Sequence, residues 1–381
     1  MPEDTLPKVL IVDDEETGPH ELGLDGLAAT RGRHPNDIDD SDLQWADLVL
    51  MDFRIQTWPE REDLEQISLR PRNGLALAAV LREHADALNG KYHRYTAFAI
   101  HSAHIGDISA RLHTTNRTPC VVARLNSLEW AFDKAEQGRF SQAAELAQAV
   151  RKVSEGWKDV EASGVAAATS GLLRLPAGLD WSERASEDVL LCQIPLSDFS
   201  AGTNGLLFLR WLLHGIMPYP TFLLGSNWVA ARLRITPDSL RDLLENKSQL
   251  ARDLSDCRYA GILQSFSGPR WWRSAIEQYA WSIRAGGAHQ PEDFHSALEA
   301  RAGRMLERVA ANSPVVCVDP RLEPLDGLQA LDSVVRLVPD LWPAYADPAY
   351  AELAVVRNDE DLCSIVHPLD RERVTAAEEE D

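Results

Sequence analysis

Three short, mainly apolar segments in the first 100 residues are each followed by polar residues of the types that bind ligands or take part in reactions. The segments and the residues that follow them are 8–12 with Asp13 and Asp14, 46–51 with Asp52, and 96–100 with His101 and Ser102. Apolar runs of this length are typical of strands buried on both faces of a parallel sheet. The carboxyl ends of such strands meet at one edge of the sheet, so we expect these polar side chains to lie close together.

Helical patterns separate these segments. The stretch that begins at Gly74 (GLALAAVLR) has the alanine content and spacing of an amphipathic helix, and residues 140–153 are strongly helical. A fourth strand is expected over 128–133, and it ends at Lys134. Strands that alternate with helices predict an α/β fold with a parallel sheet.

The chain resembles bacterial two-component receiver domains in five segments, which are, in order, KVLIVDDEE, ADLVLMDFRI, NGLALAAVLREH, AIHSAH and WAFDKAEQGRFSQAAELAQAVRKV. The resemblance extends from Pro7 to about Glu155. It implies a doubly wound, five-stranded parallel sheet of the flavodoxin-like kind over residues 1–155. It also implies a response regulator of a phosphorelay, which accepts a phosphoryl group from a histidine kinase and is not itself an enzyme.

The resemblance also implies a metal site. Asp14, Asp52 and the backbone carbonyl of Arg54 match the direct ligands of Mg²⁺ in the family, and Asp13 matches a ligand that acts through water. The chemistry agrees, because clustered carboxylates need a divalent cation with a preference for oxygen, and Mg²⁺ binds through a few carboxylates together with phosphate oxygens.

The phosphoryl-transfer roles follow from the same match. Asp52 corresponds to the phosphoryl acceptor, Lys134 to the phosphate-binding lysine and Ser102 to the hydroxyl residue that reports phosphorylation. Phosphoryl transfer goes through a loose transition state, so a protein mainly positions groups and neutralises charge. A lysine and a hydroxyl directed at the phosphoryl oxygens would position the phosphoryl group, and the lysine would also neutralise its charge.

The chain departs from the family pattern in two ways. Residues 54–73 form an insertion directly after Asp52, which we expect to act as a lid, as a docking surface or as a tolerated surface loop. Near Lys134, Ala135 stands where the family has proline, and Ala131 stands where it has an aromatic residue. These changes concern the coupling of phosphorylation to the rest of the chain more than phosphorylation itself.

The remaining residues predict an output region. We expect a linker over 156–172, an α-rich output domain over 173–310, and a small α/β part with an acidic tail over 311–381. No apolar run approaches the length of a membrane span, and the N-terminus is acidic, so a cytoplasmic location is expected. The five scattered cysteines are expected to be buried thiols.

One part of the output region resembles a DNA-binding motif. Residues 226–250 form two helical patterns that meet at a turn, with Thr236 as N-cap and Pro237 in the first helical position, which predicts a possible helix-turn-helix. An aromatic and basic run, 258–273, would then form a wing. However, the second helix carries more acidic than basic residues, which disfavours an approach to phosphates.

Charge also limits the partners of the chain. The net charge is −21, and only residues 205–310 are positive, with 13 basic against 10 acidic residues. Most of the surface would therefore repel a polyanion. We expect the output region to contact another protein; DNA binding through 226–273 is the alternative, and an enzymatic effector is a second alternative.

Overall fold

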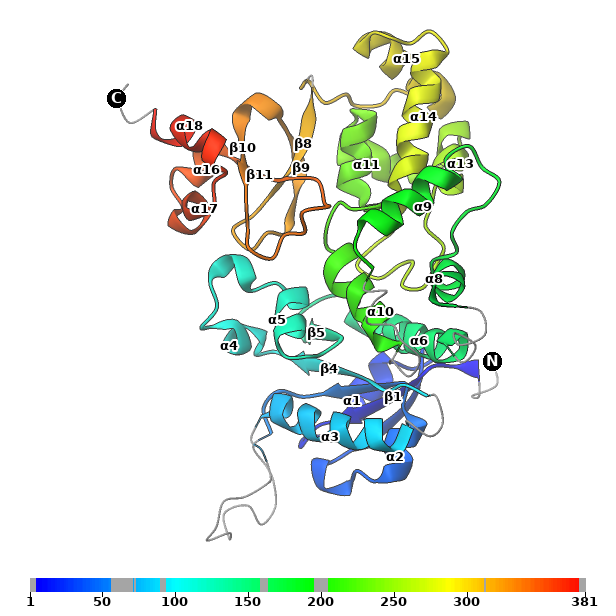
Figure 1. The fold of residues 1–381 in the computed structure, drawn as a ribbon, viewed down its shortest axis with the longest axis vertical. Helices are drawn as coiled ribbons and strands as arrows, with labels where there is room; N and C mark the ends of the chain where they lie inside the picture. The colour runs from blue at the N-terminus through cyan, green and yellow to red at the C-terminus, as the bar shows by residue number, and fades with distance from the viewer. Residues whose placement is uncertain are drawn as a thin grey trace.

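The computed structural model describes residues 5–55, 71, 73–89, 94–157, 164–194, 205–311 and 313–376. In the N-terminal part of these residues, five parallel strands form one sheet in the order β2-β1-β3-β4-β5 (Figure 1). The strands are β1 (Lys8–Val12), β2 (Ala29–Arg33), β3 (Leu48–Met51), β4 (Ala97–Ser102) and β5 (Trp130–Asp133). The helices are α1 (Gly18–Gly23), η2 (Pro35–Asp37), α2 (Asp40–Trp45), α3 (Gly74–Asn89), α4 (Ile105–Ser109), η3 (Thr114–Asn116), α5 (Pro119–Leu125) and α6 (Arg139–Trp157).

The prediction of an α/β fold with a parallel sheet is confirmed. β1, β3, β4 and β5 each coincide with a predicted apolar run, because these strands carry buried side chains along most of their length. β2 was not predicted from its own residues. Its sequence, ATRGR, lacks an apolar run because β2 lies at the edge of the sheet, pairs only with β1 and is half-buried throughout.

The segment expected to be a linker is partly helical. Gly156 and Trp157 close α6, residues 158–163 lie outside the described residues, and α8 (Val165–Leu173) follows. The prediction of a linker over 156–172 is therefore wrong for its second half. The small residues of α8 allow close packing against α6, and Leu172 and Leu173 are buried in the core.

The middle region is helical, as predicted. Its elements are α9 (Ser182–Leu191), α10 (Leu206–Trp211), the π-helical segment η5 (Leu212–Ile216), β6 (Leu223–Leu224), α11 (Ser226–Leu233), α12 (Pro237–Leu244), α13 (Gln249–Asp256), β7 (Trp271–Trp272), α14 (Arg273–Ala285) and α15 (Pro291–Ala302). The turn between α11 and α12 forms as predicted, with the Thr236 hydroxyl accepting a hydrogen bond from the Ser239 N–H at 3.2 Å.

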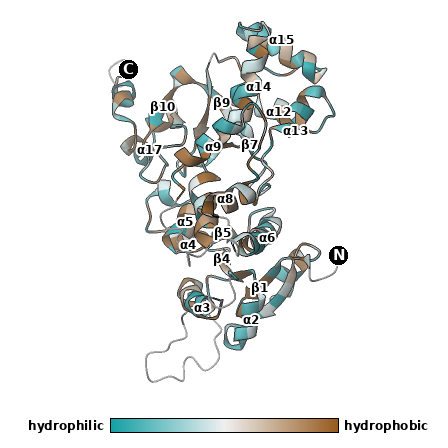
Figure 2. Ribbon diagram, turned by 45° about the vertical axis from the view of Figure 1, so that its right-hand side comes forward, coloured by the Kyte–Doolittle hydropathy of each residue, from teal (hydrophilic) through white to brown (hydrophobic). Residues whose placement is uncertain are grey.

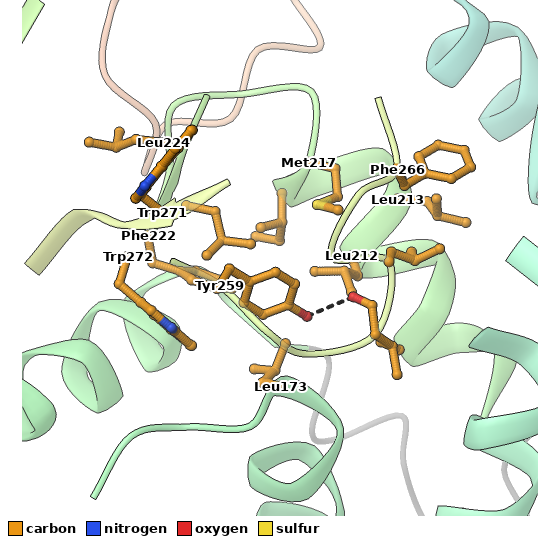
Figure 3. Packing of buried hydrophobic residues seen from close by; sticks show 14 of the residues in the cluster. Leu173, Leu212, Leu213, Met217, Phe222, Leu224, Tyr259, Phe266, Trp271 and Trp272 are labelled. Atoms are coloured by element: carbon orange, nitrogen blue, oxygen red, sulfur yellow. Dashed lines mark hydrogen bonds between the residues drawn. The ribbon is translucent and has the colours of Figure 1, made fainter. Parts of the chain in front are cut away.

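The aromatic and basic run does not form an exposed wing. Trp271 and Trp272 form β7, which pairs with β6, and both side chains are buried together with Tyr259 (Figure 3). The Trp271 indole N–H donates to the Leu254 carbonyl at 3.0 Å. The run is therefore part of the core, since large aromatic rings stabilise it by burial.

The C-terminal part is a small α/β unit. Within the described residues its strands pair in the order β10-β11-β8-β9, with β8 parallel to β11 and the other pairs antiparallel. The elements are β8 (Pro314–Val318), β9 (Pro324–Ala330), η6 (Leu331–Ser333), β10 (Val334–Leu337), β11 (Ala349–Glu352), α16 (Leu353–Val356), α17 (Glu360–Ser364), η7 (Pro368–Asp370) and α18 (Arg371–Thr375). Cys363 is exposed on α17, which corrects the prediction of five buried thiols; the other four are buried.

The parallel-sheet part and the helical part share one apolar contact zone, against which Leu328, Leu341 and Tyr345 of the C-terminal part pack. The C-terminal part also has a separate core of its own. Helix α10 packs against α6, and the Phe266 ring lies edge-on to Trp130 of β5 at a centroid separation of 4.9 Å. Figure 2 shows hydrophobic segments, coloured brown, gathered around α5, α8 and β5. No helix in the described part of the chain has the length and apolar character needed to cross a membrane.

Candidate metal centre

Three carboxylates converge at the carboxyl ends of β1 and β3. The ligand atoms of Asp13, Asp14 and Asp52 all lie within 4.8 Å of one another. Val12 pairs with Met51 in the parallel register, so the residues that follow the two strands reach the same edge of the sheet. The predicted clustering is confirmed, and it follows from strand register alone.

Lys134 completes the cluster from the end of β5. Its Nζ atom lies 2.8 Å from Asp52 Oδ1 and 3.5 Å from Asp13 Oδ2. Burial opposes the charged form of the lysine, but the hydrogen bond and the negative charge of Asp52, together with Asp13, raise the pKa of Lys134 above its usual value. The side chain is therefore a fixed cation beside the predicted acceptor.

Asp13 is the buried member of the group. Burial favours its neutral form, but hydrogen bonds from His20 and the Glu15 N–H, with the charge of Lys134, outweigh this and lower the pKa of Asp13. His20 Nε2 lies 3.5 Å from Asp13 Oδ2, and the Glu15 N–H donates to Asp13 Oδ1 at 3.0 Å. Asp13 is therefore held in its negatively charged form, which is the form that can contact a cation.

Ser102 ends β4 and is fully buried. Its hydroxyl oxygen accepts a hydrogen bond from the His104 N–H at 3.1 Å, and its carbonyl accepts one from the Lys134 N–H at 3.1 Å. The backbone thus joins Ser102 to Lys134, while the Ser102 side chain is engaged in the turn that leads into α4. A rotation of that side chain would change the turn.

Arg54 contacts Asp52 through its backbone. The Arg54 N–H donates to Asp52 Oδ2 at 2.8 Å, and the Arg54 guanidinium pairs with Asp107 of α4. Arg54 also forms a backbone bridge with Asn73, so the two ends of the predicted insertion meet beside the carboxylates. Most of the insertion, 56–70 and 72, lies outside the described residues.

Gly74 is a site residue that the sequence reasoning did not identify. A Cβ atom at this position would lie 2.0 Å from the Asp52 carbonyl oxygen. Contacts this short do not occur, so a side chain here would displace the backbone that carries Asp52. The signal was present in the sequence as a glycine at the start of an otherwise alanine-rich and leucine-rich helix, α3.

Two histidines adjoin the cluster on the side of α1 and α6. The His20 and His101 rings meet edge-on at 4.9 Å, and Phe140 packs against His101 at 5.6 Å. His101 is buried, and its Nε2 atom has no hydrogen-bond partner among the residues that the structure describes. Burial, with a smaller effect of the nearby cations, lowers the pKa of His101 to about 3, so the ring is neutral.

The donor set fits a hard divalent cation. All three clustered ligands are carboxylates, and no cysteine or histidine belongs to the group found in the described part of the chain. Oxygen ligands of this kind suit Mg²⁺, whereas softer metals favour nitrogen and sulfur. Lys134 offsets one of the three carboxylate charges, which leaves net negative charge for a metal to neutralise.

In comparisons with known proteins, no protein-family profile, no curated protein and no solved structure matches the chain.

Proposed function

We propose that this chain is a response regulator in which Asp52 accepts a phosphoryl group from a histidine kinase in the presence of Mg²⁺. The observation that carries the proposal is the convergence of Asp13, Asp14 and Asp52 within 4.8 Å, with Lys134 Nζ 2.8 Å from Asp52. The strand order β2-β1-β3-β4-β5 supports it, because this is the order of doubly wound, flavodoxin-like sheets.

The residues have distinct tasks in this proposal. An Asp52 oxygen attacks the phosphorus, the bond from phosphorus to the histidine nitrogen of the kinase breaks, and an acyl phosphate forms on Asp52. Lys134 moves from its ion pair with Asp52 to a phosphoryl oxygen. Asp14, Asp52 and the Arg54 carbonyl would hold Mg²⁺ directly and Asp13 through water, and the ion would neutralise charge as the phosphoryl group transfers.

The signal would leave the site along β4 and β5. The Ser102 hydroxyl donates to a phosphoryl oxygen, which alters the turn that His104 now closes. Lys134 shifts with the same phosphoryl group. Both strands begin at the contact zone with the output region, where the Phe98 N–H and Arg210 bind the same carboxylate of Glu129.

The output we propose is contact with another protein. Leu190 and Leu191 of α9 and Trp281 of α14 are more than half exposed, and α9 packs against α14. Exposed apolar side chains mark a partner surface where they form one contiguous patch, and the packing of these two helices is what supports such a patch here. DNA binding is less favoured, because Arg270 and Arg273 in the 258–273 run donate to main-chain carbonyls inside the protein.

Stabilisation by Mg²⁺ tests the proposal. The apparent free energy of unfolding should rise with Mg²⁺ concentration as RT ln(1 + [Mg²⁺]/Kd), about 3 kcal/mol at one hundred times Kd. Asp52→Asn should reduce this gain, because it removes a charged ligand. The matched control is Asp25→Asn, which changes an exposed carboxylate that contacts no residue of the cluster and should keep the gain. Equal responses of wild type and Asp52→Asn would contradict the proposal.

A further inference from the structure

A cavity of about 380 Å³ lies where the three parts of the chain meet. The parallel-sheet part contributes Val121 and Trp130, the helical part contributes Tyr219 and Arg270, and the C-terminal part contributes Leu341. The volume is in the range of cavities that hold small organic ligands. No residue of the carboxylate cluster lines it, so it is separate from the site described above.

The cavity walls are mainly apolar and include aromatic rings. Its lining includes Trp130 and Tyr219, which are buried, and Trp228 of α11, which is half-buried. The Tyr219 ring is fixed by an edge contact with Trp342 at 4.9 Å. Rigid aromatic walls of this kind accept a flat apolar body with little loss of side-chain freedom.

Arg270 brings an unpaired charge to this wall. Its Nη1 atom donates to the Ser267, Gly268 and Pro269 carbonyls at 3.1–3.3 Å, and its Nη2 atom donates to the Met217 carbonyl at 3.1 Å. These acceptors are neutral. Among the residues that the structure describes, no carboxylate forms an ion pair with Arg270, in contrast to Arg273, which pairs with Asp347 at 2.8 Å.

A guanidinium on a largely apolar wall is costly without an anion. Burial lowers the pKa of Arg270 to about 10, which still leaves it charged at neutral pH. The carbonyls fix the position of the side chain, but they do not neutralise it. Arg270 is the basic residue of the cavity lining, so the negative group of a ligand would be placed at its guanidinium.

We propose that the cavity binds a small monocarboxylate with an aromatic or aliphatic body, the carboxylate facing Arg270 and the body lying between Trp130, Tyr219 and Trp228. Glu136 and Glu323, both exposed, also line the cavity. Their charges disfavour ligands with several negative groups, such as nucleotides, and select a single charge. Because Trp130 and Glu136 flank Lys134 on β5 and its following loop, an occupant contacts the element that carries the phosphate-binding lysine.

Isothermal titration calorimetry on the full chain tests the proposal with three matched probes. Naphthylacetate, naphthylacetamide and naphthylethylamine share one aromatic body and differ in charge. The carboxylate should bind most tightly. Arg270→Gln, which retains a donor for the carbonyls, should weaken naphthylacetate about tenfold or more and leave naphthylacetamide unchanged. Arg258→Gln, an exposed arginine on the same segment, should bind as wild type does.

A second variant keeps the test decisive if Arg270→Gln does not fold. Val121→Phe places a larger side chain into the cavity and should abolish binding of all three probes while the protein stays folded by circular dichroism. Asp52→Asn should retain wild-type affinity, which separates this proposal from the proposed phosphorylation. Binding of the amide or the amine as tight as that of the carboxylate would overturn it, as would no binding of any probe at millimolar concentration.

Discussion

The Arg210 Nη2 atom lies 2.6 Å from Glu129 Oε1, and this ion pair joins helix α10 to the residue that precedes β5. Glu129 is fully buried, and its other carboxylate oxygen accepts the Phe98 N–H at 2.6 Å. The Glu129 carbonyl accepts a hydrogen bond from His214 at 2.8 Å. Glu129 thus connects the starts of β4 and β5 to the helical region. Ser102 and Lys134 lie at the opposite ends of these two strands.

Arg210→Met should lower the free energy of unfolding by about 3–5 kcal/mol, because it leaves the Glu129 carboxylate buried without its cation. The double variant Arg210→Met with Glu129→Gln should lose less than the sum of the two single losses. The measurement is urea unfolding. Arg241→Met is the control, since its pair with Asp238 is exposed and should contribute less than about 1 kcal/mol. Additive losses in the double variant would contradict the pairing.

Acid should destabilise the protein through His214. Burial lowers the pKa of His214 from 6.5 to about 4. Between these values the unfolded chain binds a proton that the folded chain does not, so the free energy of unfolding should fall as the pH falls from about 6.5 to about 4. His214→Gln can still donate to Glu129 and should flatten this decline. The lowered pKa of His101 acts in the same direction, so His214→Gln should keep part of the dependence of the unfolding free energy on pH. If His214→Gln and wild type show the same dependence, His214 is not a source of the acid destabilisation.

Gly74→Ala should impair the Asp52 site. The added Cβ would meet the Asp52 carbonyl oxygen, so the backbone of β3 or α3 must shift, at a cost of about 1–3 kcal/mol. Mg²⁺ binding should weaken as well. Gly106→Ala is the matched control, because a Cβ atom there meets nothing within 4 Å. Thermal unfolding with and without Mg²⁺ distinguishes the two, and equal behaviour would show that the site tolerates the displacement.

The sequence predicted much of the parallel sheet and its site because both depend on local patterns. Strands buried on both faces produce apolar runs, and the residues that follow them meet by register. The edge strand β2 gave no such run. The contact of His20 with Asp13 depends on how α1 packs, which no local pattern specifies. Aromatic and basic residues over 258–273 suit an exposed wing or a core equally, and only tertiary packing places Trp271 inside.

DNA binding by the full chain should be weak. The buried rings of 258–273 and the internal hydrogen bonds of Arg270 and Arg273 leave few cations to contact phosphates. A fluorescence anisotropy titration with duplex DNA at low and at moderate salt should show no tight binding that weakens steeply as salt rises. A steep salt dependence would favour the helix pair α11 and α12 as a DNA-contacting output.

The phosphorylation of Asp52 tests the central proposal most directly. Wild-type protein incubated with acetyl phosphate and Mg²⁺ should gain the mass of one phosphoryl group, located at Asp52 by peptide mass spectrometry after borohydride reduction. Asp52→Asn should gain none. Lys134→Ala should still bind Mg²⁺ but take up phosphate poorly, and Ser102→Ala should be phosphorylated yet transmit less change to residues 164–376. Absence of phosphorylation in the wild type at millimolar Mg²⁺ and donor, or phosphorylation that persists in Asp52→Asn, would contradict the account.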